Sequence, residues 1–376
     1  MAKIAVLGAG MVGSAIARVM SKHHKVVLFD GNPLQLKKCK GQNITTQVID
    51  FKDLLELKKR IEHVDLVMGA VPGHLGYKVL EQVILSKKNM VDISFFPEDG
   101  LKLHSLAKKN QVTAIYDCGV APGMDNILLG YHDQSMKVTD FKCYVGGLPK
   151  VKNPPFNYKA PFSPIDVLEE YTRPARFKKD GIVVTKPALT DIEHLRLPVV
   201  GTLEAFNSDG LRSLIKTMAH IPNMIEKTLR FPGHAVQMEY LKAIGLLNKK
   251  SIEVKSQTLA PIDLTAHLLF KHWKYLPGEA DFTVMQVILE GIEKSQKIRY
   301  TYDLYDEYDP VEDMSAMART TGLTACAAAE MVVQNTFREK GVFAPEYIGK
   351  APGRFGFIID YLKNSGVNYK RRRTKI

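Results

Sequence analysis

Short apolar runs alternate with amphipathic stretches over the first third of the chain. Ile4–Leu7 is an apolar run, a glycine-rich turn and an amphipathic stretch follow it, and Val26–Phe29 is a second apolar run. A short apolar run is typical of a buried strand, and apolar positions three or four residues apart are typical of a helix. The pattern therefore predicts a βαβ unit within residues 4–29.

The same alternation continues to about residue 120. Apolar, β-branched runs predict further strands at residues 64–71, 89–94 and 112–119, and helical patterns lie at residues 76–86 and 100–110. Strands that alternate with helices are typical of an α/β fold with a doubly wound parallel sheet.

The pattern changes after about residue 126. The segments DFKCYVGGL, GIVVTK and KTLRF, and a hairpin at residues 281–306, predict a mostly antiparallel sheet, with a helix near Asp263–Tyr275. A helix of small residues at Ser315–Phe337 is expected to return to the first domain. The expected domains are residues 1–125 plus 312–376, and residues 126–311 as an inserted α+β domain.

Composition supports an ordinary globular protein. The 376 residues are 45% hydrophobic and 24% charged, and no segment approaches the about 20 apolar residues of a membrane span. The four cysteines form no CxxC pair and have no metal-ligand spacing, so neither a metal site nor a disulfide framework is expected. A reducing, cytoplasmic location fits this usage.

The net charge of +12 is concentrated at the C-terminus. Five of the positive charges lie in residues 370–376, without interleaved aromatic or glycine residues. A nucleic-acid partner is therefore not expected, and the tail is predicted to be a frayed, solvated terminus.

Three glycines follow the first predicted strand with the spacing G-x-G-x-x-G. Gly8 permits a tight turn, Gly10 lets the backbone approach a pyrophosphate, and Gly13 allows close helix packing. Met11 and Val12 begin the helix, whose free N–H groups attract an anion. A glycine turn that binds nothing is the alternative.

Asp30 follows the second predicted strand, about 20 residues after the glycines. A carboxylate there accepts the adenosine ribose hydroxyls of NAD and repels the extra phosphate of NADP. Lys37 and Lys38 lie nearby and keep NADP open as the alternative.

Further cofactor contacts are expected where the next two strands end, because ligands gather beyond the carboxyl ends of parallel strands. Val71 and Pro72 are expected beside the nicotinamide ribose, and Ser94 and Phe96 are expected to face the same crevice. An ordinary proline turn and plain core aromatics are the alternatives.

Four segments carry a family resemblance: DCGVAPGMDN, GGLP, EEYTRPAR and GTLEAFNSDGLRSL. With them the chain resembles the saccharopine dehydrogenase-like family over nearly its whole length. The resemblance implies a Rossmann domain, an inserted domain for substrate and oligomer contacts, and a homo-oligomer. It also implies NAD-dependent oxidative deamination of the ε-amine of lysine, which gives 2-aminoadipate 6-semialdehyde and ammonia.

The resemblance also implies a set of site residues. Asp117, Cys118 and Val120 would form a loop between nicotinamide and substrate, and Glu204 and Arg212 would close over the opposite side. Asn207, Ser208 and Asp209 stand where saccharopine reductases are expected to have an asparagine–arginine pair, which argues against a bulky dicarboxylate product.

Amine oxidation requires a base for the amine and a partner for the substrate carboxylate. Asp117 is the expected base and Glu204 the expected partner of the ε-ammonium. Arg173 and Arg212 are candidates for the α-carboxylate, because guanidinium groups bind carboxylates bidentately. Structural ion pairs are the alternative for all four residues.

Two further residues have weaker cases. Cys118 is expected to be a wall of the pocket, since hydride transfer needs no thiol adduct, and His234 is a possible acid–base group or a structural histidine. The rival functions are a saccharopine or carboxyspermidine-type reductase and a non-catalytic NAD-binding protein.

Overall fold

The computed structural model of the chain describes residues 1–39, 41–162, 164–276 and 278–376. The chain divides into two compact units: unit 1 is residues 1–136 with 317–368, and unit 2 is residues 137–316 with 369–376. The sequence pattern predicts these changes at residues 125 and 312, with the whole C-terminus in the first domain. The last eight residues belong instead to unit 2.

Unit 1 contains a seven-stranded sheet in which every pair of neighbouring strands is parallel. In spatial order its strands are β17 (Gly341–Phe343), β6 (Thr113–Ile115), β5 (Asn89–Asp92), β4 (Leu66–Gly69), β1 (Lys3–Leu7), β2 (Lys25–Asp30) and β3 (Ile44–Val48). The chain order reverses between β1 and β4. This arrangement confirms the expected doubly wound α/β fold with a Rossmann-type sheet.

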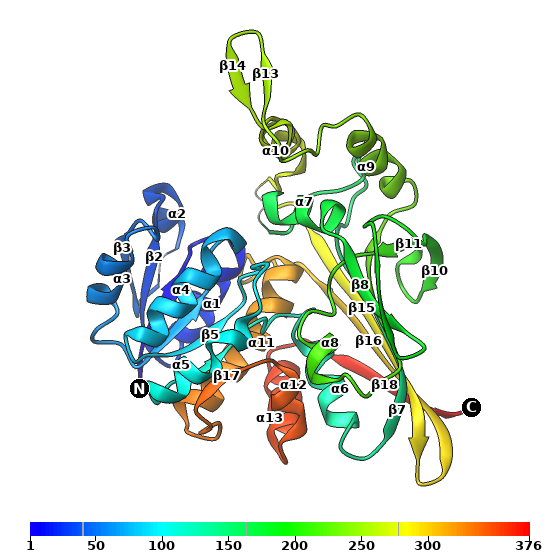
Figure 1. Cartoon of the computed structure of the whole chain (residues 1–376). Coiled ribbons are helices and arrows are strands. Elements are labelled where there is room, and N and C mark those ends of the chain that lie inside the picture. The colour runs from blue at the N-terminus through cyan, green and yellow to red at the C-terminus, as the bar shows by residue number, and fades with distance from the viewer. Residues whose placement is uncertain (40, 163, 277) are drawn as a thin grey trace. The chain divides into compact units, whose positions relative to one another are not determined.

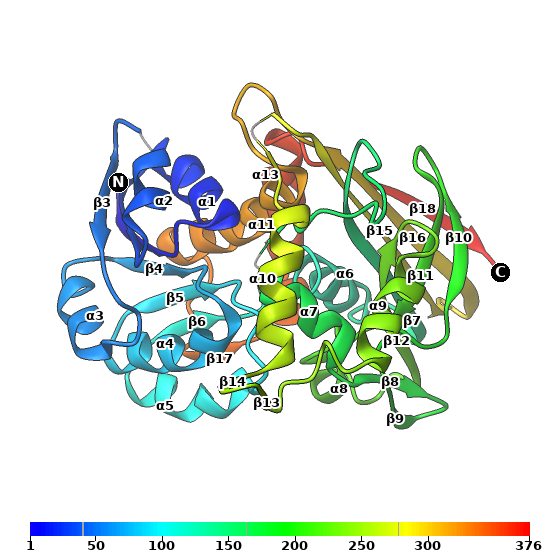
Figure 2. The ribbon, with the colours of Figure 1, turned by 90° about the horizontal axis from the view of Figure 1, so that it is seen from above.

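Helices cover both faces of this sheet (Figure 2). The helices before the second unit are α1 (Met11–Ser21), α2 (Pro33–Lys38), α3 (Leu54–Arg60), α4 (Gly73–Leu85), a 3-10 turn (Gly100–Leu103), α5 (His104–Lys109) and α6 (Met124–His132). The later helices are α11 (Ala316–Val333), α12 (Glu346–Lys350) and α13 (Arg354–Asn364).

The sheet and the small residues of α11 form the core of unit 1. Ile4 to Leu7 of β1 are completely buried, as the apolar run predicts. A Cβ on Gly322 would lie 3.3 Å from Ile16 of α1, so the glycine in α11 lets these two helices approach closely.

Unit 2 contains a nine-stranded mixed sheet. Its main path is β10 (Glu193–Leu197), β11 (Gly201–Asn207), β12 (Asn223–Arg230), β7 (Lys137–Pro149), β15 (Asp281–Glu293), β16 (Gln296–Glu307) and β18 (Tyr369–Lys375), with β8 (Ala175–Lys179) beside β12 and β9 (Ile182–Lys186) beside β8. Among the described residues, β7 and β12 pair in parallel and the other pairs are antiparallel. The mostly antiparallel sheet expected from the sequence is thus present.

The remaining elements of unit 2 pack on this sheet. Its helices are α7 (Pro164–Thr172), α8 (Leu214–Thr217), α9 (His234–Ala243) and α10 (Pro261–Trp273). Their core includes Tyr158, Tyr171 and Trp273, all nearly inaccessible to solvent. A separate hairpin of β13 (Ile252–Val254) and β14 (Gln257–Leu259) extends away from α10 (Figure 1).

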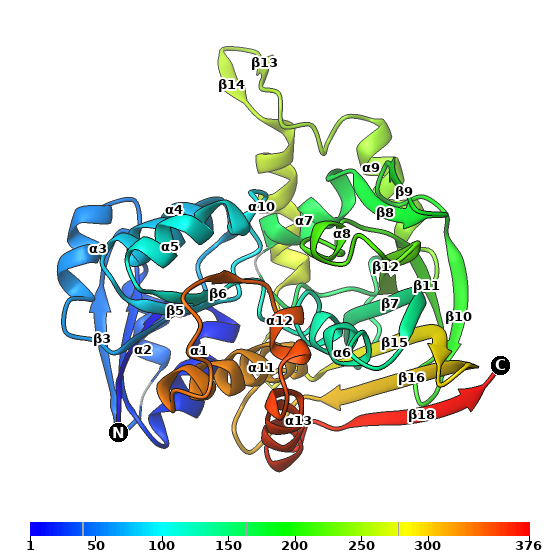
Figure 3. The ribbon, with the colours of Figure 1, turned by 60° about the horizontal axis from the view of Figure 1, so that its bottom comes forward.

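The prediction of a frayed C-terminus is wrong. Residues 369–375 form β18, which pairs antiparallel with β16 along one edge of the second sheet (Figure 3). Arg372 forms an ion pair with Asp303 at 2.8 Å, and Arg373 forms one with Glu293 at 2.7 Å. The cationic run is therefore an edge strand whose positive side chains meet acidic residues of the neighbouring strands, and such charges also oppose edge-to-edge aggregation.

Within the described residues, no helix has the length and apolarity that crossing a membrane would require.

Candidate functional site

The glycine turn after β1 leaves no room for side chains at two of its three glycines. Gly8 has φ +104°, and a Cβ there would lie 2.3 Å from the carbonyl oxygen of Ala70. A Cβ on Gly13 would lie 1.9 Å from the carbonyl oxygen of Gly8. A Cβ on Gly10 would meet nothing within 4 Å. Gly8 and Gly13 are thus required by the fold, whereas the space at Gly10 is open.

The open space at Gly10 lies at the N-terminus of α1. Gly10 is the N-cap, no side chain caps the helix, and its first turn holds no acidic residue. Met11 is 39% exposed, while Val12 is buried. Uncapped N–H groups and the positive end of the helix dipole fit the pyrophosphate of a dinucleotide.

Asp30, at the end of β2, is tied to the same turn. Its Oδ2 accepts the N–H of Ala9 at 2.6 Å, and its Oδ1 accepts the N–H of Asn32 at 2.7 Å. The carboxylate is only half-buried, so it can still accept hydroxyl groups of a ribose. Lys37 and Lys38 lie in the last turn of the adjacent α2.

The loops after β4 and β5 hold the other residues expected at the cofactor, and also Phe96, which was expected to contact the substrate. Pro72 is the exposed N-cap of α4, and Val71 before it is buried. Ser94 is buried and its hydroxyl donates to Asp92. Phe96 lies in the hydrophobic core, where its ring stacks on Tyr116.

Asp92, the last residue of β5, was not among the residues expected from the sequence. It is completely buried, and its Oδ1 accepts both the N–H of Ser94 at 3.2 Å and the Ser94 hydroxyl at 2.8 Å. Gly69 makes room for it, since a Cβ there would lie 2.1 Å from Oδ1. Burial first, and the charge of Asp117 as well, raise the pKa of Asp92 to about 7, although the Ser94 hydrogen bonds oppose the rise.

Asp117 and Cys118 follow β6 in the same unit. Asp117 is 2% exposed and has φ +54°, a left-handed conformation that is uncommon for a residue other than glycine. Cys118 is completely buried, and burial together with the charges of Asp117 and Asp92 raises its pKa to about 12. Its thiol therefore stays protonated near neutral pH. Val120, two residues on, is also buried.

Arg173 and Arg212 lie close enough in unit 2 to affect each other. Burial and then the positive charge of Arg212 lower the pKa of Arg173, which Glu169 partly offsets as an ion-pair partner at 3.5 Å. Arg176 is held separately, because both oxygens of Asp209 accept its guanidinium N–H groups at 2.8 Å. Repulsion between these two neighbouring cations, one buried and one partly buried, is what a carboxylate would relieve.

Glu204 and His234 meet at the start of α9. The carboxylate of Glu204 accepts the N–H groups of Gly233 at 2.8 Å and Ala235 at 2.5 Å, so it fixes the N-terminus of this helix. His234 is buried and shares a hydrogen bond of 2.9 Å with the hydroxyl of Tyr171. Burial and the charge of Arg230 lower the pKa of His234 to about 3, so the imidazole is neutral at physiological pH.

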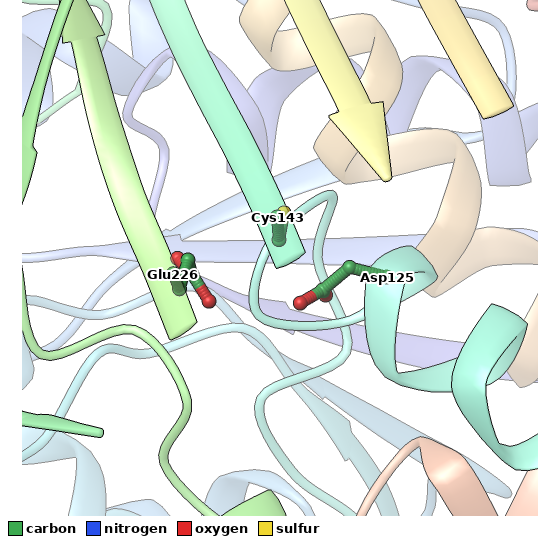
Figure 4. Close-up of side chains that lie close together, drawn as sticks. All are labelled: Asp125, Cys143 and Glu226. Atoms are coloured by element: carbon green, nitrogen blue, oxygen red, sulfur yellow. The ribbon is translucent and has the colours of Figure 1, made fainter. Parts of the chain in front are cut away.

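Glu226 is a further buried acidic residue of unit 2. Glu226 of β12 stands opposite Cys143 of the parallel neighbour β7 (Figure 4), and a Cβ on Gly210 would lie 1.8 Å from the Glu226 carboxylate. Asp125, drawn in the same figure, belongs to the first turn of α6 in unit 1, where it accepts the N–H of Gly123 at 2.9 Å.

Known proteins resemble both parts of the chain. Residues 4–115 match the family model described as the saccharopine dehydrogenase NADP binding domain, and residues 119–367 match the saccharopine dehydrogenase C-terminal domain. The solved apo saccharopine dehydrogenase (L-Glu forming) of Saccharomyces cerevisiae has a TM-score of 0.79 at 20% identity, over 100% of both chains.

Two curated relatives show how the lengths compare. The mitochondrial alpha-aminoadipic semialdehyde synthase of Bos taurus is 22% identical over 99% of this chain and 48% of its own length. Saccharopine dehydrogenase [NADP(+), L-glutamate-forming] of Pyricularia oryzae is 24% identical over 81% of this chain and 84% of its own. The chain thus spans about half the length of the bovine relative.

Proposed function

Because the chain belongs to the saccharopine dehydrogenase family, we propose that it is a nicotinamide-dependent oxidoreductase acting on the carbon–nitrogen bond of an amino acid. Our first candidate is the L-lysine 6-dehydrogenase reaction. The ε-ammonium of lysine, water and NAD⁺ would give the 6-aldehyde, ammonium, NADH and a proton. The bound nicotinamide would accept the hydride from Cε.

The observation that carries this proposal is the pair of neighbouring guanidinium groups in unit 2, of which Arg212 is buried and Arg173 is partly buried. Arg212 lowers the pKa of Arg173 by repulsion between like charges, and the carboxylate of an amino acid would relieve that repulsion. Arg176 pairs bidentately with Asp209, and Arg173 pairs with Glu169 at 3.5 Å. We therefore assign the substrate α-carboxylate to Arg173 and Arg212.

We assign the acid–base role to Asp117. Its carboxyl group is buried at the end of β6, and its left-handed backbone is the kind of strain that folds retain at functional positions. Glu204 was the other expected acidic residue. Since both of its oxygens accept backbone N–H groups of α9, we assign it the role of fixing that helix.

For the cofactor we propose NAD. Asp30 holds the glycine turn through Ala9 and retains acceptor capacity for a ribose, whereas a 2′-phosphate next to its carboxylate would be repelled. The description of the matching family model is of an NADP binding domain, so both cofactors belong in the test.

The test uses the full chain with L-lysine and either NAD⁺ or NADP⁺. We expect reduced cofactor and ammonia in equal amounts with NAD⁺, and loss of both products in Asp117→Asn. Cofactor binding without reduction over neutral and alkaline pH would contradict the lysine reaction. The homo-oligomer expected from the sequence stays a prediction, for which light scattering is the measurement.

A saccharopine-type reductase is the second candidate, favoured by the activity for which the similar proteins are named. Such an enzyme joins an amine to a carbonyl compound and reduces the imine. Consumption of NADPH or NADH that requires both an amino acid and a 2-oxo acid or aldehyde would decide for it. Cofactor binding with neither activity would favour a non-catalytic dinucleotide-binding protein.

A further inference from the structure

Asp92 lies on the part of the sheet where the nicotinamide half of a dinucleotide is expected. The glycine turn after β1 fits the pyrophosphate, and Asp30 at the end of β2 fits the adenosine ribose. The remaining half of the ligand must then extend across the strand ends on the opposite side of β1, which are β4 and β5. Asp92 is the last residue of β5.

The carboxyl group of Asp92 is only half satisfied. Its Oδ1 accepts two hydrogen bonds from Ser94, but Oδ2 is buried and has no hydrogen-bond partner among the described residues. Leaving a buried acceptor unpaired is costly, and the cost is larger for an ionised one. The absence of a side chain at Gly69 leaves the space that the Asp92 carboxyl occupies, so the position of this carboxyl in the fold is specific.

The charged neighbour of Asp92 adds to that cost. Asp117 carries the same sign, and its charge adds to burial in raising the pKa of Asp92 to about 7. Cys118, also nearby, stays a neutral thiol. Ionised Asp92 would thus be stabilised by a positive charge, and the ring of an oxidised nicotinamide carries one.

We propose that Asp92 makes the protein prefer the oxidised over the reduced nicotinamide cofactor, and that this preference grows as Asp92 ionises with rising pH. An ionised carboxylate in a dry environment attracts the pyridinium ring, while the neutral dihydropyridine of the reduced cofactor gains nothing from it. The inference rests on the proposed function only in needing a bound nicotinamide dinucleotide. This preference would make the relative binding of oxidised and reduced cofactor depend on pH, and with it the direction that the reaction favours.

The experiment compares dissociation constants for NAD⁺ and NADH by calorimetry on the full chain. The ionised fraction of Asp92 rises from about a tenth at about pH 6 to about nine tenths at about pH 8, so the ratio of the two constants is expected to shift about tenfold toward NAD⁺. The ratio of the two dissociation constants is used because the effects of groups that act equally on the oxidised and the reduced cofactor cancel in it. The same holds for the extra phosphate if NADP⁺ and NADPH are the better ligands.

Asp92→Asn keeps the shape of the side chain and is expected to make the ratio independent of pH. Asp125→Asn is the matched control, because Asp125 is an equally buried carboxyl of unit 1 whose pKa is also raised by burial, but it lies at the start of α6. This control is expected to keep the shift. Retention of the shift in Asp92→Asn would overturn the proposal, and so would loss of the shift in both variants.

A measurement on the unmodified protein covers the case in which Asp92→Asn does not fold. Near pH 7, NAD⁺ binding is expected to release about half a proton, detected as a binding enthalpy that depends on the buffer, and NADH binding is expected to release none. Equal proton release with both forms, or a pH-independent ratio, overturns the inference and leaves the cofactor assignment intact. Failure to bind any dinucleotide overturns the proposed function instead.

Discussion

Arg230 in unit 2 and Asp92 in unit 1 are both almost completely buried, but their polar atoms are satisfied to very different degrees. The guanidinium of Arg230 donates to Glu170 at 2.5 Å, to the hydroxyls of Tyr171 and Tyr158, and to a backbone carbonyl. Among the residues that the structure describes, only one oxygen of Asp92 has hydrogen-bond partners.

The difference separates a structural charge from one that is kept for a ligand. A buried ion whose nitrogen atoms all have partners within the protein holds a core in one arrangement and has little left to offer a substrate. A buried ion with an unused oxygen lowers stability, so the fold retains it at a cost that a bound partner offsets. Unit 2 holds its residues in place around Arg230, whereas unit 1 keeps a carboxyl with one unpartnered oxygen at the end of an inner strand.

Removing one partner of the Arg230 pair is the change with the largest expected effect. Glu170→Gln leaves the guanidinium buried without its counter-charge, so we expect unfolding free energy to fall by about 3–5 kcal/mol in denaturant titrations. Glu307→Gln is the matched control, because Glu307 pairs with Lys150 at the surface and should cost less than about 1 kcal/mol. Equal losses of unfolding free energy in the two variants would mean that the buried pair with Arg230 contributes no more to stability than the surface pair does.

Asp92→Asn is expected to change stability in the opposite direction. Its pKa is about 7 in the fold against an ordinary 3.8, so the folded protein binds this proton more tightly than the unfolded chain does. The wild type therefore loses stability as pH rises from about 4 to about 7, and no further loss is expected above that. The Asp92→Asn variant has no carboxyl group to titrate at this position, so this fall in stability is not expected for it.

The measurement is the difference in unfolding free energy between Asp92→Asn and wild type at several pH values. We expect the difference to move in favour of the variant by a few kcal/mol across that window, since a tenfold change in proton affinity is worth about 1.4 kcal/mol. A difference that stays constant with pH would mean that Asp92 does not titrate there.

Arg212→Met tests whether the arginines of unit 2 serve the substrate. We expect KM for the amino acid to rise about tenfold or more and kcat to change less, because a carboxylate contact made in the bound state is lost. Arg176→Met is the control, since Asp209 already neutralises that guanidinium. A fall in kcat with unchanged KM would argue against carboxylate binding by Arg212.

Local patterns in the sequence predicted five strands of the first sheet and its glycine turn, but not β3 and β17. The spacing of Gly8, Gly10 and Gly13 after an apolar run, with Asp30 downstream, depends on contacts within one βαβ unit. The family resemblance was also confirmed over both parts of the chain.

Contacts between distant segments were not predictable in this way. The Arg230 cluster joins residues 158, 170, 171 and 234, and the C-terminal strand pairs with a strand about 70 residues earlier. Asp92 ends an apolar run that indicates only a strand, and its burial follows from Gly69 on the neighbouring strand. The contacts of Glu204 with backbone N–H groups at the start of α9 also join distant segments, so they could not be predicted from a local pattern either.

Gly10→Ala is expected to have the smallest effect on the fold. Within the glycine turn it separates a glycine kept for a ligand from a glycine that the fold itself requires. Gly10 has φ −67°, and its Cβ would meet nothing within 4 Å, so alanine should cost less than about 1 kcal/mol of unfolding free energy. A methyl group would occupy the space that we assign to the pyrophosphate, so NAD⁺ affinity should fall about tenfold. In Gly13→Ala the Cβ would lie 1.9 Å from the Gly8 carbonyl, and the protein itself should be destabilised. Unchanged NAD⁺ affinity in a stable Gly10→Ala protein would place the dinucleotide elsewhere, because no other consequence of that methyl group is expected.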